Sequence, residues 1–115
     1  MTIEDLQTIC RQLPGVTEDV KWDVHLCFNV GGKMFLVTAP DEVPCTASFK
    51  VPVEEFDALS AQPGFKPAPY MARNHWVHLD NIARLGRAQW EQHIRESYRL
   101  VAEKLPAKVR KTLAL

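Results

Sequence analysis

The chain has 115 residues and an ordinary apolar fraction, which is enough for one compact domain and excludes a disordered or low-complexity protein. Its cysteines, Cys10, Cys27 and Cys45, are odd in number and form no paired motif, which argues against a disulfide framework or a zinc site and favours a cytoplasmic protein with reduced thiols. No stretch approaches the roughly 20 apolar residues of a membrane helix, and the first residues carry acids in place of a basic targeting region, so we expect no membrane partner.

The formal net charge is zero, but the charges are unevenly distributed along the chain. Residues 1–62 contain ten acidic and four basic side chains, whereas residues 84–111 contain eight basic and three acidic ones. Such asymmetry can mark a polyanion partner, and it can equally be solvated surface whose two halves complement each other within the fold. Charge alone leaves both interpretations open.

The first predicted element is a short amphipathic helix. Thr2 and Asp5 stand at the spacing of a capping box, and apolar residues recur at helical intervals from Ile3 to Leu13. The following Pro14 and Gly15 end the pattern. We therefore expect a helix over these residues with one apolar face toward the core.

A β-hairpin is the clearest pattern in the chain. Apolar and polar side chains alternate over residues 23–28 and again over residues 33–37, and Gly31 and Gly32 between them supply the positive φ angles of a tight turn. Residues 47–51 alternate in the same way and predict a third antiparallel strand. Together the three strands predict a meander.

A second helix and an edge strand are predicted next. Pro52 suits the first turn of a helix, and residues 62–64, Gln-Pro-Gly, would end it. Residues 65–72 contain two prolines, which lack the N–H donor that a strand ladder requires. We expect this segment to begin as a loop and to become an edge strand near Pro69.

The last predicted elements are a strand and a long helix. Residues 75–80 alternate as a fifth strand, and apolar residues then recur every three or four positions from Trp90 to Leu105, until Pro106 ends the helix. The predicted order is α-β-β-β-α-β-β-α. It occupies a single domain over residues 1–115, with a short basic tail at residues 107–115.

Six short motifs follow one another along the chain, namely Lys21-Trp22, Gly32-Lys33-Met34-Phe35, Ala68-Pro69-Tyr70, Trp76-Val77, Ser97-Tyr98 and Leu105-Pro106. In this order they resemble the MmcQ/YjbR family over nearly the whole chain. The resemblance implies a two-layer α+β fold with one antiparallel sheet packed by helices, similar to type III secretion chaperones and frataxin-like folds. It also implies DNA binding, the label that members of the family commonly carry, and it supplies no catalytic residues.

No constellation of residues indicates catalysis. His75 and His78 form the only close histidine pair, but three steps along a strand place their side chains on opposite faces, a poor geometry for one metal ion. Ser97 lacks the glycines of a nucleophile elbow, and residues 31–33 form a hairpin turn and not a phosphate loop. We therefore expect a noncatalytic domain without metal or cofactor.

The aromatic residues have two possible roles. Trp22, Tyr70 and Trp76 can supply the bulk of a small core. If they are exposed, they form a surface together with Lys21 and Arg73, on which unpaired bases or a peptide could stack. The sequence favours the core, and the exposed surface is the alternative.

The basic residues limit the DNA-binding interpretation. Along the predicted terminal helix, basic and acidic side chains follow each other at four-residue spacing and largely neutralise one another, whereas the tail beyond Pro106 is basic without any acid. The predicted nucleic-acid contacts are therefore the hairpin and tail residues Lys33, Arg73, Trp76, Lys108, Arg110 and Lys111.

Two functions of different classes follow. In the first, implied by the family resemblance, these residues bind DNA without sequence preference, which would make the affinity salt-sensitive. In the second, implied by the likeness to secretion chaperones, the sheet or a helix face binds a protein partner or a second copy of the chain as a homodimer. A contiguous exposed apolar patch would favour the second function.

Overall fold

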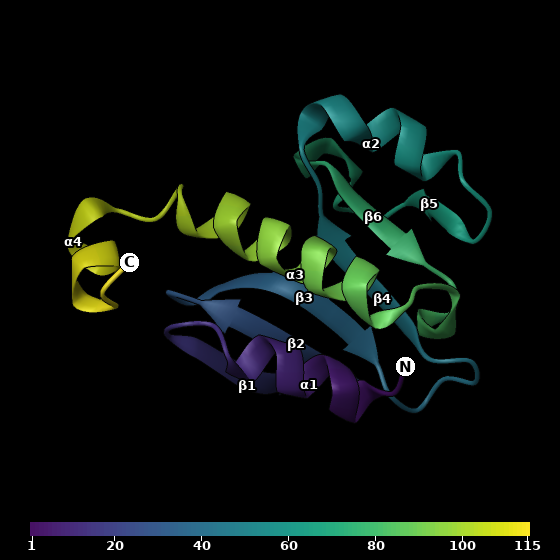
Figure 1. Cartoon of the computed structure of the whole chain (residues 1–115), viewed down its shortest axis with the longest axis horizontal. Coiled ribbons are helices and arrows are strands. Elements are labelled where there is room, and N and C mark those ends of the chain that lie inside the picture. The colour runs from purple at the N-terminus through teal and green to yellow at the C-terminus, as the bar shows by residue number, and fades with distance from the viewer.

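The computed structural model describes all 115 residues. Its helices are α1 (Ile3–Arg11), α2 (Val53–Ser60), α3 (Arg87–Ala102) and α4 (Ala107–Thr112), with 3-10 turns η1 (Ala72–Asn74) and η2 (Ile82–Arg84). Its strands are β1 (Val16–Lys21), β2 (His25–Val30), β3 (Lys33–Ala39), β4 (Thr46–Lys50), β5 (Phe65–Pro67) and β6 (Trp76–Leu79). They form one antiparallel sheet in the order β1-β2-β3-β4-β6-β5, which confirms the predicted α+β class (Figure 1).

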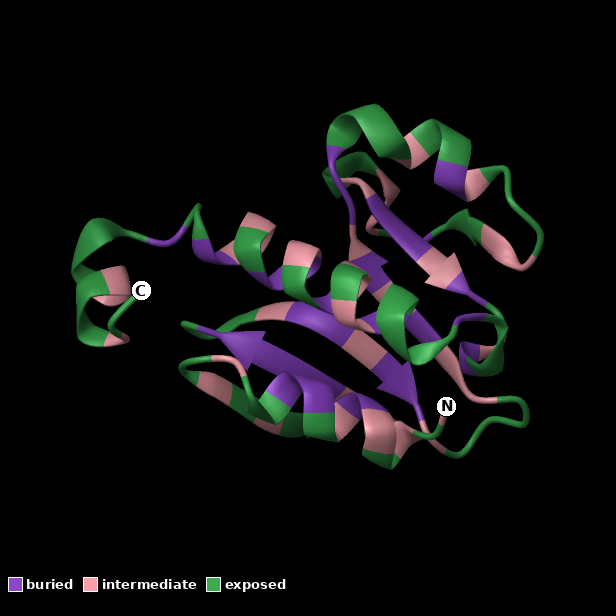
Figure 2. Cartoon of the chain, in the orientation of Figure 1, coloured by how far each residue is buried: buried purple, intermediate pink, exposed green.

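The helices contribute to one core with the sheet. α3 packs against β2, β3 and β4 and contacts α1, while α2 packs on β5 and β6 (Figure 1). Figure 2 shows buried residues concentrated on the central strands and on the side of α3 that faces them. No helix combines the length and the apolar composition that a membrane crossing requires.

The strand register places one apolar row across the sheet. Phe28 of β2 pairs with Leu36 of β3, Leu36 with Phe49 of β4, and Phe49 with Val77 of β6. Residues paired in this way point to the same face, and all four are fully buried in the core. α3 closes over the row, where the ring of Trp90 packs against Phe49 with centroids 5.5 Å apart. This row is the centre of the hydrophobic core.

A hydroxyl from α3 reaches between two strands of the sheet. The pairing of β3 with β4 ends at Leu36 and Phe49, so Phe35 and Lys50 would be the next pair. Instead, Ser97 Oγ donates to the Phe35 carbonyl at 2.6 Å and accepts the Lys50 N–H at 3.0 Å. Ser97 is fully buried, and it satisfies the backbone of both strands at the point where they part.

The first edge of the sheet differs from the sequence prediction. β1 was not predicted, and the strand expected at residues 23–28 begins instead at His25. Trp22 and Asp23 form the intervening turn, with φ angles of 54° and 61°. β1 pairs only with β2 and leaves most of its side chains outside the core, so it lacks the apolar alternation that marks a half-buried strand.

The opposite edge also differs. The edge strand expected near Pro69 is β5, which lies earlier, and the loop follows it. Pro67 is tolerated at the end of β5 because β5 pairs with β6 alone. Backbone pairing continues for one more residue, since Ala68 N–H donates to the Trp76 carbonyl. The prediction of an edge strand is correct, and its placement is wrong.

The terminal basic segment is helical. α3 ends at Ala102, and the segment predicted as a basic tail contains α4, whose Val109 side chain packs on the core together with Leu113. The β2–β3 turn lies against this junction, because a Cβ at Gly31 would come within 2.7 Å of Leu105 and 3.2 Å of Val109. The turn therefore requires glycine for its space as well as for its φ of 58°.

We predict that Ser97→Ala lowers the free energy of unfolding by about 1–3 kcal/mol, because the substitution leaves buried backbone groups of Phe35 and Lys50 without a partner. Urea denaturation followed by circular dichroism would measure the change. The matched control is Ser60→Ala, since the Ser60 hydroxyl is buried without any hydrogen-bond partner. We expect the control to stay within about 0.5 kcal/mol of the parent. Equal losses in both variants would contradict the bridging role of Ser97.

We also predict that stability falls as the pH drops below about 6.5, the pKa of an unfolded histidine. Burial lowers the pKa of His93, whose ring packs 5.0 Å from Phe49, and the Glu96 charge opposes this only in part. The unfolded chain then binds more protons than the folded chain, so the free energy of unfolding decreases as the pH falls.

Urea denaturation of the parent and of His93→Gln between about pH 7 and about pH 5 would test this pH dependence. The variant should show a shallower decrease, because it lacks one of the titrating groups. It should not become flat, since burial also lowers the pKa of His78. Indistinguishable slopes would show that His93 does not contribute.

Candidate functional site

A hollow of about 320 Å³ lies where β3 and β4 part and α3 ends. Lys33 enters it from the start of β3, Lys50 from the end of β4 and Lys104 from the residues after α3. Trp76 and Met71 line it as well, and none of its 10 lining residues is acidic. We call this cavity the lysine hollow.

The charges of the lysine hollow are uncompensated. Burial lowers the pKa of Lys50, and the positive charge of Lys104 lowers it further. None of the three lysines takes part in an ion pair, whereas Arg11, Arg84 and Arg99 each have a carboxylate partner. Like charges that converge without a counter-charge oppose folding, and a bound anion would relieve that cost.

The predicted contact residues on the β-strands and η1 do not all lie in the lysine hollow. Lys33 lines the hollow, whereas Arg73 is exposed on η1 and does not line it. Trp76, predicted to stack on bases, is only 4 % exposed, so its ring packs in the wall of the hollow and offers no free face. Sequence reasoning missed Lys50 and Lys104, which lie far apart along the chain and meet only because β4 and the end of α3 converge.

The predicted contacts of the terminal segment lie on α4. Lys108 and Lys111 are exposed there, and Arg110 is half-buried with its Nε shielded from solvent and without a hydrogen-bond partner. Because Val109 of α4 packs close to Gly31, these bases lie near the β2–β3 turn that carries Lys33. The segment therefore continues the basic surface at this end of the sheet.

The sheet face opposite the core row carries a second row of paired side chains. Cys27 pairs with Val37, Val37 with Ser48, and Ser48 with His78. Each lies one residue before or after a member of the core row, so the alternation of strands directs it to the other face. Val37, Ser48 and His78 of this second row form the floor of a larger cavity.

That cavity has a volume of about 710 Å³, within the usual range for a small-molecule site. Its rim is aromatic, because it includes Trp22 from the β1–β2 turn and Tyr70 from the loop after β5. The two residues are 68 % and 103 % exposed, so the core role is wrong for this pair and the alternative of an exposed aromatic surface holds for it, whereas Trp76 is buried. We call the cavity the aromatic groove.

The floor of the aromatic groove carries hydroxyl and imidazole groups. Ser48 Oγ lies 2.9 Å from His78 Nδ1, and burial lowers the pKa of His78, with the Lys66 charge as the next contribution. His25 packs edge-to-face on Trp22 with ring centroids 5.7 Å apart, and its Nδ1 is buried without a hydrogen-bond partner. No lining residue is a lysine, arginine, aspartate or glutamate.

The two cavities are neighbours. Met34 and Met71 line both the lysine hollow and the aromatic groove, so a shared wall of two flexible thioether side chains separates them. A cationic cavity and an aromatic cavity thus adjoin at the open end of β3 and β4.

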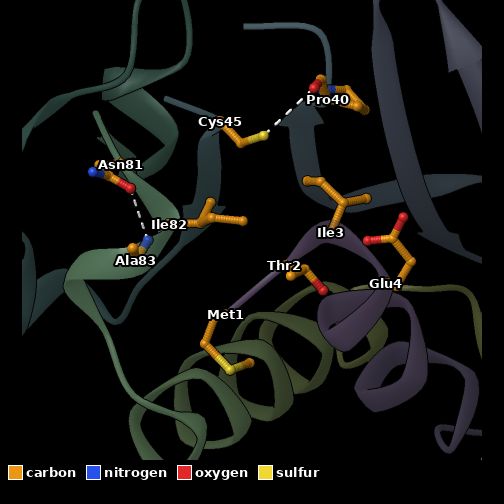
Figure 3. Close-up of a pocket in the computed structure, with 9 residues that line it drawn as sticks. All are labelled: Met1, Thr2, Ile3, Glu4, Pro40, Cys45, Asn81, Ile82 and Ala83. Atoms are coloured by element: carbon orange, nitrogen blue, oxygen red, sulfur yellow. Dashed lines mark hydrogen bonds between the residues drawn. The ribbon is translucent and has the colours of Figure 1, made fainter. Parts of the chain in front are cut away.

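A third cavity, of about 350 Å³, lies between the N-terminus and the residues around η2 (Figure 3). Cys45 Sγ donates to the Pro40 carbonyl, and the Asn81 side chain accepts from the Ala83 N–H. Figure 3 shows Ile82 close to these groups, and both hydrogen bonds run to backbone atoms. No unpartnered buried polar atom of this structure lines the cavity, so we assign no site there.

Comparisons with known proteins identify the fold family. A family model described as YjbR matches residues 11–100. The crystal structure of Deinococcus radiodurans protein DR2400, with the family-model domain DUF419, has a TM-score of 0.88 and 30 % sequence identity and covers 99 % of this chain and 88 % of that one. A crystal structure of a protein from Pseudomonas syringae has a TM-score of 0.71 and 20 % identity, with 87 % of this chain and 98 % of that chain covered. No curated protein matches.

The matched residues extend from the end of α1 into α3 and so include the whole sheet and both rows of paired side chains. The Pseudomonas syringae protein supports the fold alone at its low identity. The family model and the Deinococcus radiodurans structure agree with the resemblance found from the six sequence motifs. The chain belongs to the YjbR family.

Proposed function

We propose that the chain is a noncatalytic domain that binds nucleic acid, with the phosphate backbone held in the lysine hollow. The supporting observation is the convergence of Lys33, Lys50 and Lys104 on one cavity without an acidic residue. Phosphate oxygens are the anions that such a cluster of lysines suits, and contacts of this kind carry no sequence information. Binding would therefore be salt-sensitive and indifferent to sequence.

Neighbouring bases extend this surface. Lys108 and Lys111 are exposed on α4, close to the β2–β3 turn, and Arg73 is exposed one residue before Asn74, which lines the hollow. A nucleic-acid strand lying in the hollow could continue toward α4 or toward Arg73. The zero net charge of the chain does not argue against nucleic-acid binding, because electrostatic attraction of a phosphate backbone depends on the local field and not on the total charge.

Two buried thiols support a noncatalytic role. Burial raises the pKa of Cys10 to about 12, and burial is also the main cause of the raised pKa of Cys27. A thiol is nucleophilic as its thiolate, so neither residue suits covalent catalysis. Ser48 has a histidine neighbour, but no further group in the chain hydrogen-bonds to the His78 ring to orient it.

A second candidate is a protein partner or a second copy of the chain. β1 pairs only with β2, and Val20, Trp22 and Val24 beside this free edge are 63 %, 68 % and 50 % exposed. An added strand could pair with the edge and cover these side chains. Light scattering after size exclusion would exclude the second copy if the chain is monomeric at micromolar concentration.

We predict that replacing Lys33, Lys50 and Lys104 together by alanine weakens nucleic-acid binding and its salt dependence. The loss of three phosphate contacts should lower the slope of log affinity against log salt by about 2 to 3. Fluorescence anisotropy of a labelled single strand and a labelled duplex, each titrated with protein at several salt concentrations, would measure both quantities.

The matched control removes the same charge elsewhere. Arg11, Arg84 and Arg99 are exposed and each pairs with a carboxylate, so their joint replacement by alanine changes the net charge equally without touching the hollow. We expect this control to keep most of the affinity and the salt slope. Equal losses in both triple variants, or no binding by the parent chain at low salt, would overturn the proposal.

A further inference from the structure

We propose that the aromatic groove receives an unpaired nucleobase of the strand whose phosphates lie in the lysine hollow, so that the domain prefers single-stranded to duplex nucleic acid. This extends the proposed function and rests on it for the phosphate contacts. The observation that leads to it is the contiguity of the two cavities through Met34 and Met71.

The juxtaposition has the chemistry of a nucleotide. A nucleotide links a planar, uncharged heteroaromatic base through a sugar to an anionic phosphate. The groove offers aromatic and thioether surfaces with no charged side chain, and the hollow offers three lysines with no acid. A charged small molecule would find no partner in the groove, and an apolar chain would leave the lysines unpaired.

The rim of the groove suits stacking. Trp22 and Tyr70 are the two most exposed aromatic residues of the chain and border one cavity. Every base has a π-face, so stacking on such rings tolerates any sequence, as the proposed phosphate contacts do. Met34 and Met71 can adapt their shape to an inserted ring and make favourable sulfur–aromatic contacts.

The floor of the groove can hydrogen-bond to a base edge. His25 lines the groove, and its buried Nδ1 has no hydrogen-bond partner, an arrangement that is costly unless the ring turns to meet water or a ligand. The Ser48 hydroxyl and the His78 ring lie on the same floor. Hydroxyl and imidazole groups can both donate and accept hydrogen bonds, and so they match the donors and acceptors of a base.

The backbone at the rim is strained. Trp22 has a φ of 54° and Tyr70 a φ of 64°, a region that bulky side chains rarely adopt. Residues held in such conformations cluster at binding sites, where the surrounding structure enforces a backbone conformation that the residue alone would not adopt. Of the five non-glycine residues with positive φ, Trp22 and Tyr70 are the two that line the groove.

Duplex nucleic acid could use the hollow but not the groove. Its bases are paired and stacked on their neighbours, so presenting one to Trp22 and Tyr70 requires unstacking. The lysine contacts reach only the backbone and are available in both forms. A preference for single strands is therefore the signature that separates base insertion from phosphate binding alone.

The test is anisotropy of a labelled oligothymidylate and of a labelled blunt-ended duplex, titrated with the parent chain and with Trp22→Ala and Tyr70→Ala. We expect each substitution to weaken single-strand binding about 5- to 100-fold, the loss of one stacked base, and duplex binding less than about twofold. Trp22→Phe keeps an aromatic face and should retain most of the single-strand affinity.

Val20→Ala is the matched control, because Val20 is exposed on the adjoining strand and does not line the groove. It should bind both probes as the parent does. Circular dichroism of each variant would verify that the sheet is intact, which is expected since both rim residues are exposed.

The outcomes separate the two proposals. Losses confined to the single strand support base insertion. Equal affinity of the parent chain for both probes, or equal losses on both in the alanine variants, overturns base insertion while the lysine hollow stands. Unchanged binding after replacement of the three lysines overturns the phosphate site.

Discussion

One buried hydroxyl sets the geometry on which both candidate cavities depend. Ser97 takes the place of a backbone pair between β3 and β4, so the two strands part beneath α3 without unsatisfied groups. Beyond that point the β3–β4 ladder stops, and Lys50, Met34 and Trp76 line the hollow beside it. The same contact fixes the height of α3 above the apolar row and therefore the packing of the core.

The two faces of the sheet are not independent. Because side chains alternate, a register that buries Phe28, Leu36 and Phe49 against α3 must present Cys27, Val37 and Ser48 on the other face. A slip of one residue would exchange the core row for the groove floor. The hydrophobic effect thus holds the floor of the groove in place, although no helix packs on it.

Local patterns predicted the elements that have one apolar and one polar side. The β2–β3 hairpin and the apolar stripe of α3 carried such a signal, whereas β1 leaves most of its side chains outside the core and carried none. The candidate site was harder to predict, because Lys50 and Lys104 lie 54 residues apart in the sequence and come together only in the fold. Trp76 shows a further limit: its place in a strand was predicted, but its burial depends on neighbours such as Lys50 and Lys104 that only the fold brings to it.

The left-handed backbone at Trp22 and Tyr70 has an engineering consequence. Glycine and asparagine adopt positive φ angles at lower cost than large aromatic residues do. A library screened for heat resistance alone would be enriched in such replacements at both positions. The selected variants would be more stable but would lack the aromatic rim of the groove. Selection for thermal stability and selection for ligand binding would then favour different residues at these two positions. The residues recovered there would show which of the two properties each selection required.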